Sequence, residues 1–254
     1  MPKLVLKNIS LHRQQACVLK PFSAYFNAGE IIAVVGNNGS GKSTLLQTLA
    51  GLRKDAGQIY FDDKDSQHLS RLALAQKLSL LMQSSIVHPY ALAYNRIAQG
   101  LMPHVGFCST PDQQSSQLIE ESAHKLKITH LLNKPLARMS GGEQRLVNIA
   151  KCLVNPRISI ILLDEPSVYL DFSQAANLRK NLIEKAQLGA LVIFASHDRE
   201  LIEHCATKVL FIEQQCASIH SPAAFFSSFN REGVNPIFCS SPMIDKLHPD
   251  IRRF

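Results

Sequence analysis

The sequence has no run of apolar residues long enough to cross a lipid bilayer, although 46% of its 254 residues are hydrophobic. Its first residues, Met1 to Leu6, resemble a short strand and carry no apolar region of the secretory type. We therefore expect the chain to be synthesised and kept in the cytosol. The length allows one large domain, or a core with an inserted subdomain.

Cysteine pairs are missing as well, because none of the six cysteines stands in a C-x-x-C motif. Scattered cysteines predict reduced thiols and argue against a zinc site or a disulfide framework. The ten histidines are also isolated, and for all but His197 we expect a role in packing or at the surface. The cysteines are Cys17, Cys108, Cys152, Cys205, Cys216 and Cys239.

Basic residues exceed acidic ones, which gives a net charge of +7, but no run of five or more Lys and Arg residues occurs. Three interpretations compete: a nucleic-acid binder, a protein that rests on anionic lipid, and a basic surface that only aids solubility. The dispersion of the charges weakens the first. Contact with a negatively charged membrane face stays open, at about 1 kcal/mol for each nearby basic residue.

A glycine-rich loop is the most informative stretch that the sequence does contain. It fits the phosphate-loop pattern G-x-x-x-x-G-K-[ST], follows the β-branched run 31–35, and precedes a helical pattern with Leu45, Leu46, Leu49 and Leu52 on one face. The alternative is a Gly/Ser turn that happens to contain a lysine, and the flanking strand and helix argue against it. The loop therefore predicts a nucleoside triphosphate cradle, in which Lys42 meets β/γ oxygens and Ser43 suits Mg²⁺. Its residues are Gly36, Asn37, Asn38, Gly39, Ser40, Gly41, Lys42, Ser43 and Thr44.

The order of strand and helix signals predicts an α/β nucleotide-binding core with a helical insertion at about 84–150. Within the insertion, Thr110 and Pro111 favour a helix start, followed by the apolar stripe Leu118, Ile119, Ala123 and Leu126. We assign 1–220 to this domain and 221–254 to a short tail packed on it. Strand signals lie at Leu4–Leu6, around Val18, and at Tyr25–Phe26, Gln58–Phe61, Ile158–Leu163, Leu191–Ala195 and Val209–Ile212.

Two acids end the buried run Ile160–Leu163. Carboxylates at the carboxyl edge of a parallel sheet face the nucleotide crevice, so Asp164 is placed to hold Mg²⁺ and Glu165 to polarise an attacking water. An acidic junction stopped by Pro166 is the ordinary alternative. The phosphate loop upstream favours the catalytic interpretation.

The stretch Met139-Ser140-Gly141-Gly142-Glu143-Gln144 indicates the family. Ser140 suits an N-cap, and the helix that follows offers a second N-terminus for a phosphate. Shortly before the Asp164-Glu165 strand, this stretch resembles the signature motif of ATP-binding-cassette (ABC) ATPases. In the same order, Gln83 resembles the family's Q-loop glutamine, Asp171 its D-loop aspartate and His197 its switch histidine.

The resemblance implies a P-loop NTPase (RecA-like) core with an N-terminal antiparallel β subdomain and an inserted α-helical subdomain. It also implies a dimer with two ATPs between the copies, each phosphate loop facing Ser140, Gly141, Gly142 and Glu143 of the other copy. Glu165 would be the general base, His197 would hold the attacking water, Asp171 would lie by the nucleotide, and Gln83 would approach Mg²⁺. A second copy, integral permease subunits and, indirectly, a solute-binding protein are the implied partners, at the cytoplasmic face of the membrane. No nucleic acid is expected.

Softer similarities point to a subfamily. The stretch 99–106 and the stretch 167–172 resemble parts of iron–siderophore importer ATPases, a lineage that haem and vitamin B12 importers share. A loop turn is the alternative for the first. Three departures from the family stand out: His12 and Arg13 lie where an aromatic usually stacks on adenine, Gln144-Arg145-Leu146 replaces the usual Arg-Gln-Arg or Gln-Gln-Arg, and Ser167 replaces threonine.

Other functions fit less well. Translation-type ABC proteins usually carry two cassettes, DNA-maintenance members carry long coiled coils, and a small-molecule kinase would leave Ser140-Gly141-Gly142 and His197 unexplained. An exporter subunit stays open. We therefore expect an ATPase subunit of an importer for an iron–siderophore-type chelate, with haem or vitamin B12 import, or a soluble ABC ATPase, as alternatives.

Overall fold

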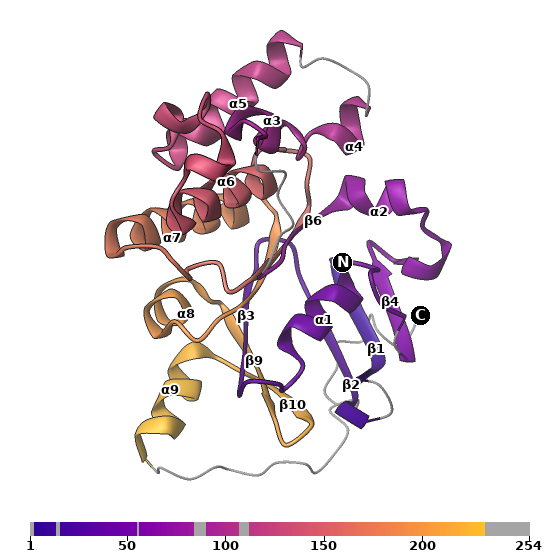
Figure 1. Ribbon diagram of the computed structural model, residues 1–254. Helices are drawn as coiled ribbons and strands as arrows, with labels where there is room; N and C mark the ends of the chain where they lie inside the picture. The colour runs from indigo at the N-terminus through magenta and orange to yellow at the C-terminus, as the bar shows by residue number, and fades with distance from the viewer. Residues whose placement is uncertain (1–2, 14–15, 55, 84–89, 107–111, 232–254) are drawn as a thin grey trace.

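Two β-sheets and the helices around them make up the part of the chain that the computed structural model describes, which is residues 3–13, 16–54, 56–83, 90–106 and 112–231 (Figure 1). The N-terminal sheet has the order β2-β1-β4-β5, and the larger sheet has the order β10-β9-β3-β8-β7-β6. The fold is thus α/β with an added antiparallel layer, as the family resemblance implied.

The N-terminal sheet is antiparallel. It contains β1 (Leu4–Arg13), β2 (Ala16–Phe26), β4 (Ala56–Phe61) and β5 (Lys64–Asp65), with Leu4 opposite both Phe26 and Phe61. The predicted strands here were too short, because the β1–β2 ladder continues through three register shifts to Arg13 opposite Ala16. Ile9 and Leu11 stay buried across those shifts, so core packing carries the strand past its polar residues.

The larger sheet is parallel except at one edge. Its parallel strands are β3 (Ile31–Gly36), β6 (Leu78–Leu81), β7 (Ile160–Asp164), β8 (Leu191–Ala195) and β9 (Lys208–Glu213), and β10 (Cys216–His220) pairs antiparallel with β9. Strands β6 and β10 were not predicted. The first is only Leu-Ser-Leu-Leu, and the second has a weak strand pattern after a turn in which Gln214 and Gln215 both have positive φ.

Both faces of this sheet are covered, which explains the unbroken apolar runs of its strands. In β3, Ile31 and Ala33 belong to one buried cluster, and Ile32 and Val34 belong to another. The first cluster includes residues of α6 (Gly141–Leu153), α7 (Phe172–Gln187) and α8 (Arg199–Cys205). The second includes α1 (Lys42–Leu49) and the N-terminal sheet. The predicted apolar face of α1 was wrong at Leu52, which lies past the helix end and is exposed.

The described residues between β6 and β7 form helices, apart from an isolated bridge between Leu92 and Pro135. The helices are α3 (Ala93–Ala98), α4 (Met102–Val105), α5 (Gln113–Lys125) and α6, with short 3₁₀ turns at Thr129–Leu131 and Leu136–Arg138. They form the upper part of the molecule in Figure 1. Helix α5 is capped by Asp112, whose side chain accepts from Ser115 N. The predicted start at Thr110 and Pro111 lies outside the described residues.

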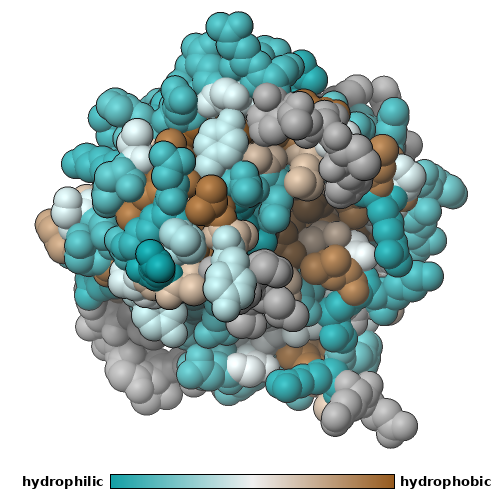
Figure 2. All heavy atoms as spheres, turned by 45° about the horizontal axis from the view of Figure 1, so that its top comes forward, coloured by the Kyte–Doolittle hydropathy of each residue, from teal (hydrophilic) through white to brown (hydrophobic). Residues whose placement is uncertain are grey.

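Helix α9 (Pro222–Arg231) follows the sheet. Phe225 is buried against Phe211, with ring centroids 5.3 Å apart, and Arg199 lies over the ring of Phe226. The predicted tail beyond residue 231 lies outside the described part. No helix among the described residues is long and apolar enough to span a bilayer. Hydrophilic side chains cover most of the face shown in Figure 2 and interrupt its hydrophobic areas.

The prediction of reduced thiols was wrong at Cys216. Cys17, Cys152 and Cys205 carry free thiols, whereas Cys216 is disulfide-bonded. Cys108 and Cys239 lie outside the described residues. Spacing along the sequence indicates only local pairs such as C-x-x-C, so it does not reveal a bond that the tertiary fold brings about.

Candidate nucleotide-binding site

The phosphate loop joins the carboxyl end of β3 to the first turn of α1. Gly41 is the N-cap of α1 with φ of 103°, a backbone conformation that side-chain-bearing residues rarely adopt, and a Cβ at this position would lie 2.8 Å from Val18 Cγ1. Asn37, Asn38 and Gly39 are exposed at the tip of the loop. The loop therefore presents its backbone and the free N–H groups of α1 on an open side.

Lys42 is buried although it carries a charge. Its ammonium group donates to Gly36 O at 2.7 Å and to Asn37 O at 3.2 Å, so it is folded back onto the loop. Burial lowers the pKa of Lys42, and the charges of Glu165 and Asp164 act in the opposite direction. Ser40 Oγ is also buried, without a hydrogen-bond partner among the described residues. A cationic donor and an unpartnered hydroxyl fit the oxygens of a polyphosphate.

Asp164 lies at the end of β7 and is joined to the predicted metal-binding residues. Its carboxylate accepts hydrogen bonds from the Ser43 hydroxyl and from the backbone of Gln83. Burial raises the pKa of Asp164, while Ser43, Arg145, Lys42 and the Gln83 backbone act to lower it. The side chains of Ser43 and Asp164 thus offer oxygen ligands side by side, as Mg²⁺ prefers. Gln83 takes part here through its backbone, and the residue itself is exposed.

Glu165 lies next to His197 at the same edge of the sheet. His197 Nε2 is 3.5 Å from Glu165 Oε1, and the backbone of His197 also hydrogen-bonds the Glu165 carboxylate. Burial raises the pKa of Glu165, against the lowering effects of His197 and Lys42. Glu165 has φ of 49°, and its N–H donates to Ala195 O at 2.9 Å. A partly buried carboxylate beside an imidazole is suited to accept a proton from water.

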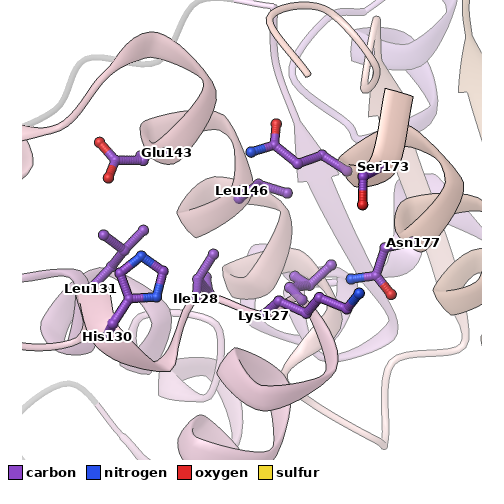
Figure 3. A pocket seen from close by; sticks show the side chains of 10 residues that line it. Lys127, Ile128, His130, Leu131, Glu143, Leu146, Ser173 and Asn177 are labelled. Atoms are coloured by element: carbon purple, nitrogen blue, oxygen red, sulfur yellow. The ribbon is translucent and has the colours of Figure 1, made fainter. Parts of the chain in front are cut away.

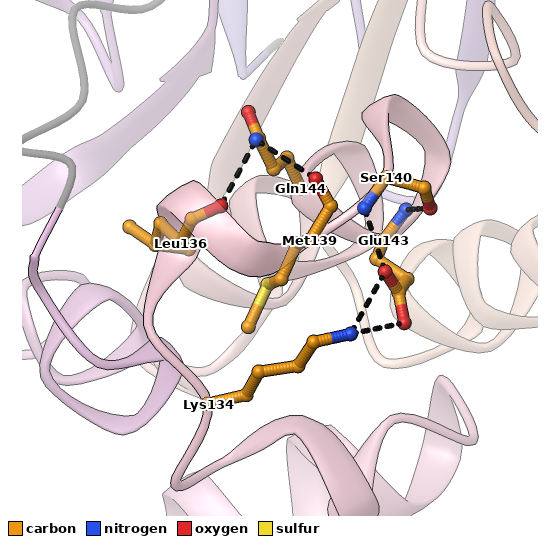
Figure 4. Close-up of polar contacts among 6 residues, drawn as sticks. All are labelled: Lys134, Leu136, Met139, Ser140, Glu143 and Gln144. Atoms are coloured by element: carbon orange, nitrogen blue, oxygen red, sulfur yellow. Dashed lines mark hydrogen bonds and ion pairs between the residues drawn. The ribbon is translucent and has the colours of Figure 1, made fainter.

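The predicted N-cap at Ser140 is confirmed, and it is part of a reciprocal capping box. Glu143 N donates to Ser140 Oγ at 3.2 Å, and Ser140 N donates to Glu143 Oε2 at 2.7 Å (Figure 4). The hydrogen bond from Ser140 N and the ammonium of Lys134 lower the pKa of Glu143. Gln144, where this chain departs from the family, donates to Leu136 O and Met139 O and so joins α6 to the segment before it.

We expect Ser140→Ala to lower the free energy of unfolding by about 1 kcal/mol, the usual cost of a lost N-cap, and to reduce ATP turnover as well. Urea denaturation and phosphate release measure the two effects. Ser70→Ala is the matched control, because Ser70 caps α2 (Arg71–Lys77) through Ala73 N. The control should lose stability and keep its turnover. Equal turnover in the two variants would remove Ser140 from the ATP site.

The D-loop contacts the signature residues. Asp171 caps α7 and forms a second capping box with Gln174. A Cβ on Gly142 would lie 2.6 Å from Tyr169 O, so only glycine permits this approach of α6 to the D-loop. Tyr169 and Phe172 are 76% and 73% exposed. The signature and the D-loop therefore form one surface, with two large aromatic side chains facing outward.

A cavity of about 250 Å³ lies between α6, α7 and the segment after α5 (Figure 3). It is bordered by Glu143 of the signature and Gln174 of the D-loop helix. Lys42, Asp164, Glu165 and His197 do not line it, so it is separate from the phosphate-binding residues. Its other lining residues are Leu126, Lys127, Ile128, His130, Leu131, Leu146, Ser173 and Asn177.

The subfamily stretch 99–106 contains the short helix α4 in place of the loop turn considered as the alternative. Gln76 donates to Pro103 O at 2.8 Å, and His104 Nδ1 is 2.8 Å from Asn155 Nδ2. The stretch thus attaches α4 to α2 and to the segment after α6. His12 and Arg13 are exposed at the end of β1, where Arg53 donates to His12 O at 2.7 Å.

Arg145 is the residue that the sequence analysis missed. It is buried on α6, and its guanidinium donates to the backbone carbonyls of Met82, Asp164 and Glu165. A signal was available: Arg145 is four residues before Ile149 and seven before Cys152, both buried, so it falls on the apolar face of the helix.

Residues 19–168 match the family model described as ABC transporter. The chain is 32% identical to the vitamin B12 import ATP-binding protein of Photobacterium profundum, over 81% of this chain and 83% of that protein. It is 30% identical to the hemin import ATP-binding protein of Rhodococcus jostii, over 85% of this chain and 73% of that protein.

Solved structures agree on the fold. A transporter provisionally assigned to the metal-chelate type, in an inward-facing conformation, matches with a TM-score of 0.76 and 24% identity, over 91% of this chain and 87% of that one. The phosphate loop, the two carboxylates and the capped signature helix occur in this chain in the order that the family resemblance implied. This chain therefore belongs to the ABC transporter family of ATP-hydrolysing transporter ATPases.

Proposed function

We propose that this chain is the ATP-hydrolysing subunit of an ABC importer, with the reaction taking place at the carboxyl edge of β3, β7 and β8. The observation that carries the proposal is the gathering of Lys42, Ser43, Asp164, Glu165 and His197 at this edge. Neighbouring strand ends bring them together, since Asp164 is paired with Ala195 and Val34 is also paired with Ala195. Ligands bind at this edge in open α/β sheets.

The residues divide the work by their chemistry. Lys42 and the N–H groups of the loop Gly36–Thr44 bind the phosphate oxygens of ATP, with Lys42 exchanging its loop carbonyls for them. Glu165 takes a proton from the attacking water, and His197 holds that water beside the carboxylate. Ser43, Asp164 and Gln83 would hold Mg²⁺. The ion supplies positive charge that neutralises the phosphate oxygens.

A second copy of the chain completes the site. Ser140 and Gly141 are exposed at the N-terminus of α6, where free N–H groups favour an anion. We place this N-terminus, with Gly142 and Glu143, against the ATP held by the phosphate loop of the other copy, and Asp171 beside it. The exposed rings of Tyr169 and Phe172 support burial of this face between two copies.

The relatives support a membrane partner, and similarities in the sequence support a cargo. A polytopic permease would hold the dimer at the cytoplasmic face of the membrane, as a peripheral subunit, and a solute-binding protein would deliver cargo from the other side. The cargo we favour is an iron–siderophore-type chelate, on the similarity of residues 99–106 and 167–172 to importers of such chelates. The relatives named for vitamin B12 and for hemin make cobalamin and haem the alternatives.

Purification of the tagged chain from detergent-solubilised membranes of its host tests the proposal, with the untagged host as control. We expect a permease to co-purify. Vesicles that contain the complex should then take up a ferric siderophore with ATP, in preference to haem or cobalamin. Preferential uptake of haem or cobalamin would show that the proposed cargo is wrong. Recovery of ribosomes or DNA-repair proteins in place of a permease would overturn the transport function.

A further inference from the structure

A single side chain connects the signature helix to the catalytic edge of the sheet. The Arg145 guanidinium donates through NH1 to Met82 O at 2.9 Å, and through NH2 to Glu165 O at 2.6 Å and to Asp164 O. Met82 precedes Gln83 at the end of β6, and the two acids end β7. Arg145 lies in the second turn of α6, the helix that Ser140 caps. It therefore joins three functional segments that are far apart in the sequence.

Stability alone does not account for this arrangement. Only 7% of Arg145 is exposed; burial lowers its pKa, and the nearby charges of Asp164 and Glu165 act in the opposite direction. Its hydrogen-bond partners are carbonyl oxygens, and Nε is buried without a partner among the described residues. A buried charge with incomplete pairing contributes little net stability. The backbone segments that Arg145 holds in place give a better reason for its burial.

The backbone that Arg145 holds is strained at the residue that needs accurate placement. Glu165 has φ of 49°, a region that residues other than Gly, Asn and Asp seldom occupy. Its N–H is fixed by Ala195 O, and its carbonyl is fixed by Arg145. The two bonds hold the peptide units on both sides of the Glu165 Cα, and so the direction of its side chain.

We propose that Arg145 is a positioning residue of ATP hydrolysis, which fixes the backbone of Glu165, Asp164 and Met82 to the helix that begins with the signature. A tilt of α6 then moves the catalytic carboxylate, so that ATP bound at Ser140 and Gly141 aligns Glu165. The inference rests on the proposed roles of these residues. It adds a physical link between the signature of one copy and the base of the same copy.

Arg145→Met and Arg145→Lys test the link. Methionine keeps the aliphatic length and removes every donor, and lysine keeps the charge but cannot form the fork to three carbonyls. We expect Arg145→Met to lower kcat about 10- to 100-fold, as a small misplacement of a catalytic group does, with the Kd for ATP changed less than about threefold. Arg145→Lys should recover part of kcat.

Arg96→Met is the matched control. Arg96 also donates to α6, through Nε to Asn148 Oδ1 at 2.8 Å, but contacts no residue of the catalytic edge among the described residues. Its variant should lose thermal stability and keep kcat. If Arg145→Met fails to fold, Arg145→Lys decides: reduced kcat at normal stability supports the link, and normal kcat overturns it.

The same assay separates this inference from the proposed function. Normal turnover by Glu165→Gln would overturn the base assignment itself. Normal kcat in Arg145→Met, beside an inactive Glu165→Gln, would overturn only the positioning role. A fall in kcat that Arg96→Met reproduces at equal loss of stability would also overturn it.

Discussion

Glu165→Gln is expected to bind ATP and to hydrolyse it about 10²- to 10⁴-fold more slowly, the range that a lost general base gives. The amide keeps the size of the side chain and its contact distance to His197, but it cannot accept the proton of the attacking water. Because hydrolysis would reopen the dimer, the variant should also accumulate as an ATP-bound dimer. Phosphate release and size-exclusion chromatography with ATP measure the two effects.

Glu184→Gln serves as the control for Glu165→Gln. Glu184 lies on the surface of α7 and pairs with Lys125, so its amide variant changes a carboxylate outside the catalytic edge. It should hydrolyse ATP at the normal rate, and its share of dimer with ATP should equal that of the parent chain. Normal turnover in Glu165→Gln would show that another group takes the proton.

Lys42→Ala is expected to weaken ATP binding itself. Removing one member of a buried, charge-assisted contact costs about 2–5 kcal/mol, which is roughly a 30-fold to several-thousand-fold increase in Kd. The structure gives the reason: the ammonium is already desolvated and held in the loop by Gly36 O, so it meets the phosphates with little reorganisation. Titration calorimetry with ATP measures the change.

The control for Lys42→Ala is Lys180→Ala, which removes an exposed lysine from α7. Its Kd for ATP should stay within about twofold of the parent value, since exposed charges away from a ligand contribute little. Thermal unfolding without nucleotide checks that both variants fold. Unchanged ATP affinity in Lys42→Ala would contradict the phosphate cradle.

Local sequence was sufficient where local chemistry decides the structure. The apolar runs of β3, β7, β8 and β9 predicted buried parallel strands, because a sheet covered on both faces needs no polar alternation. Ser140 was predicted as an N-cap because its hydroxyl serves a neighbour only three residues away. The contact of Ser43 with Asp164 could also be predicted, because the carboxyl ends of parallel strands in one sheet meet at one edge.

Features that depend on tertiary contacts were not predictable in this way. The short strand β6 is held by its pairing with β7, and its own residues are compatible with a helix or a loop. Glu165, with its positive φ, is held by its hydrogen bond to Ala195 O and by one from Arg145, and both residues are distant in sequence. The helical period places Arg145 on the buried face of α6, but arginine usually lies at the surface, so its burial was not predicted.

The two exposed aromatic rings beside the D-loop affect how the isolated protein behaves in solution. Tyr169 and Phe172 give the free subunit an apolar area, although Arg179 lies 5.9 Å from the Phe172 ring centroid and covers part of it. If this face is buried between copies, the share of active enzyme depends on the total protein concentration. Specific activity would then rise from nanomolar to micromolar protein, and adsorption to surfaces would be strongest in the most dilute samples.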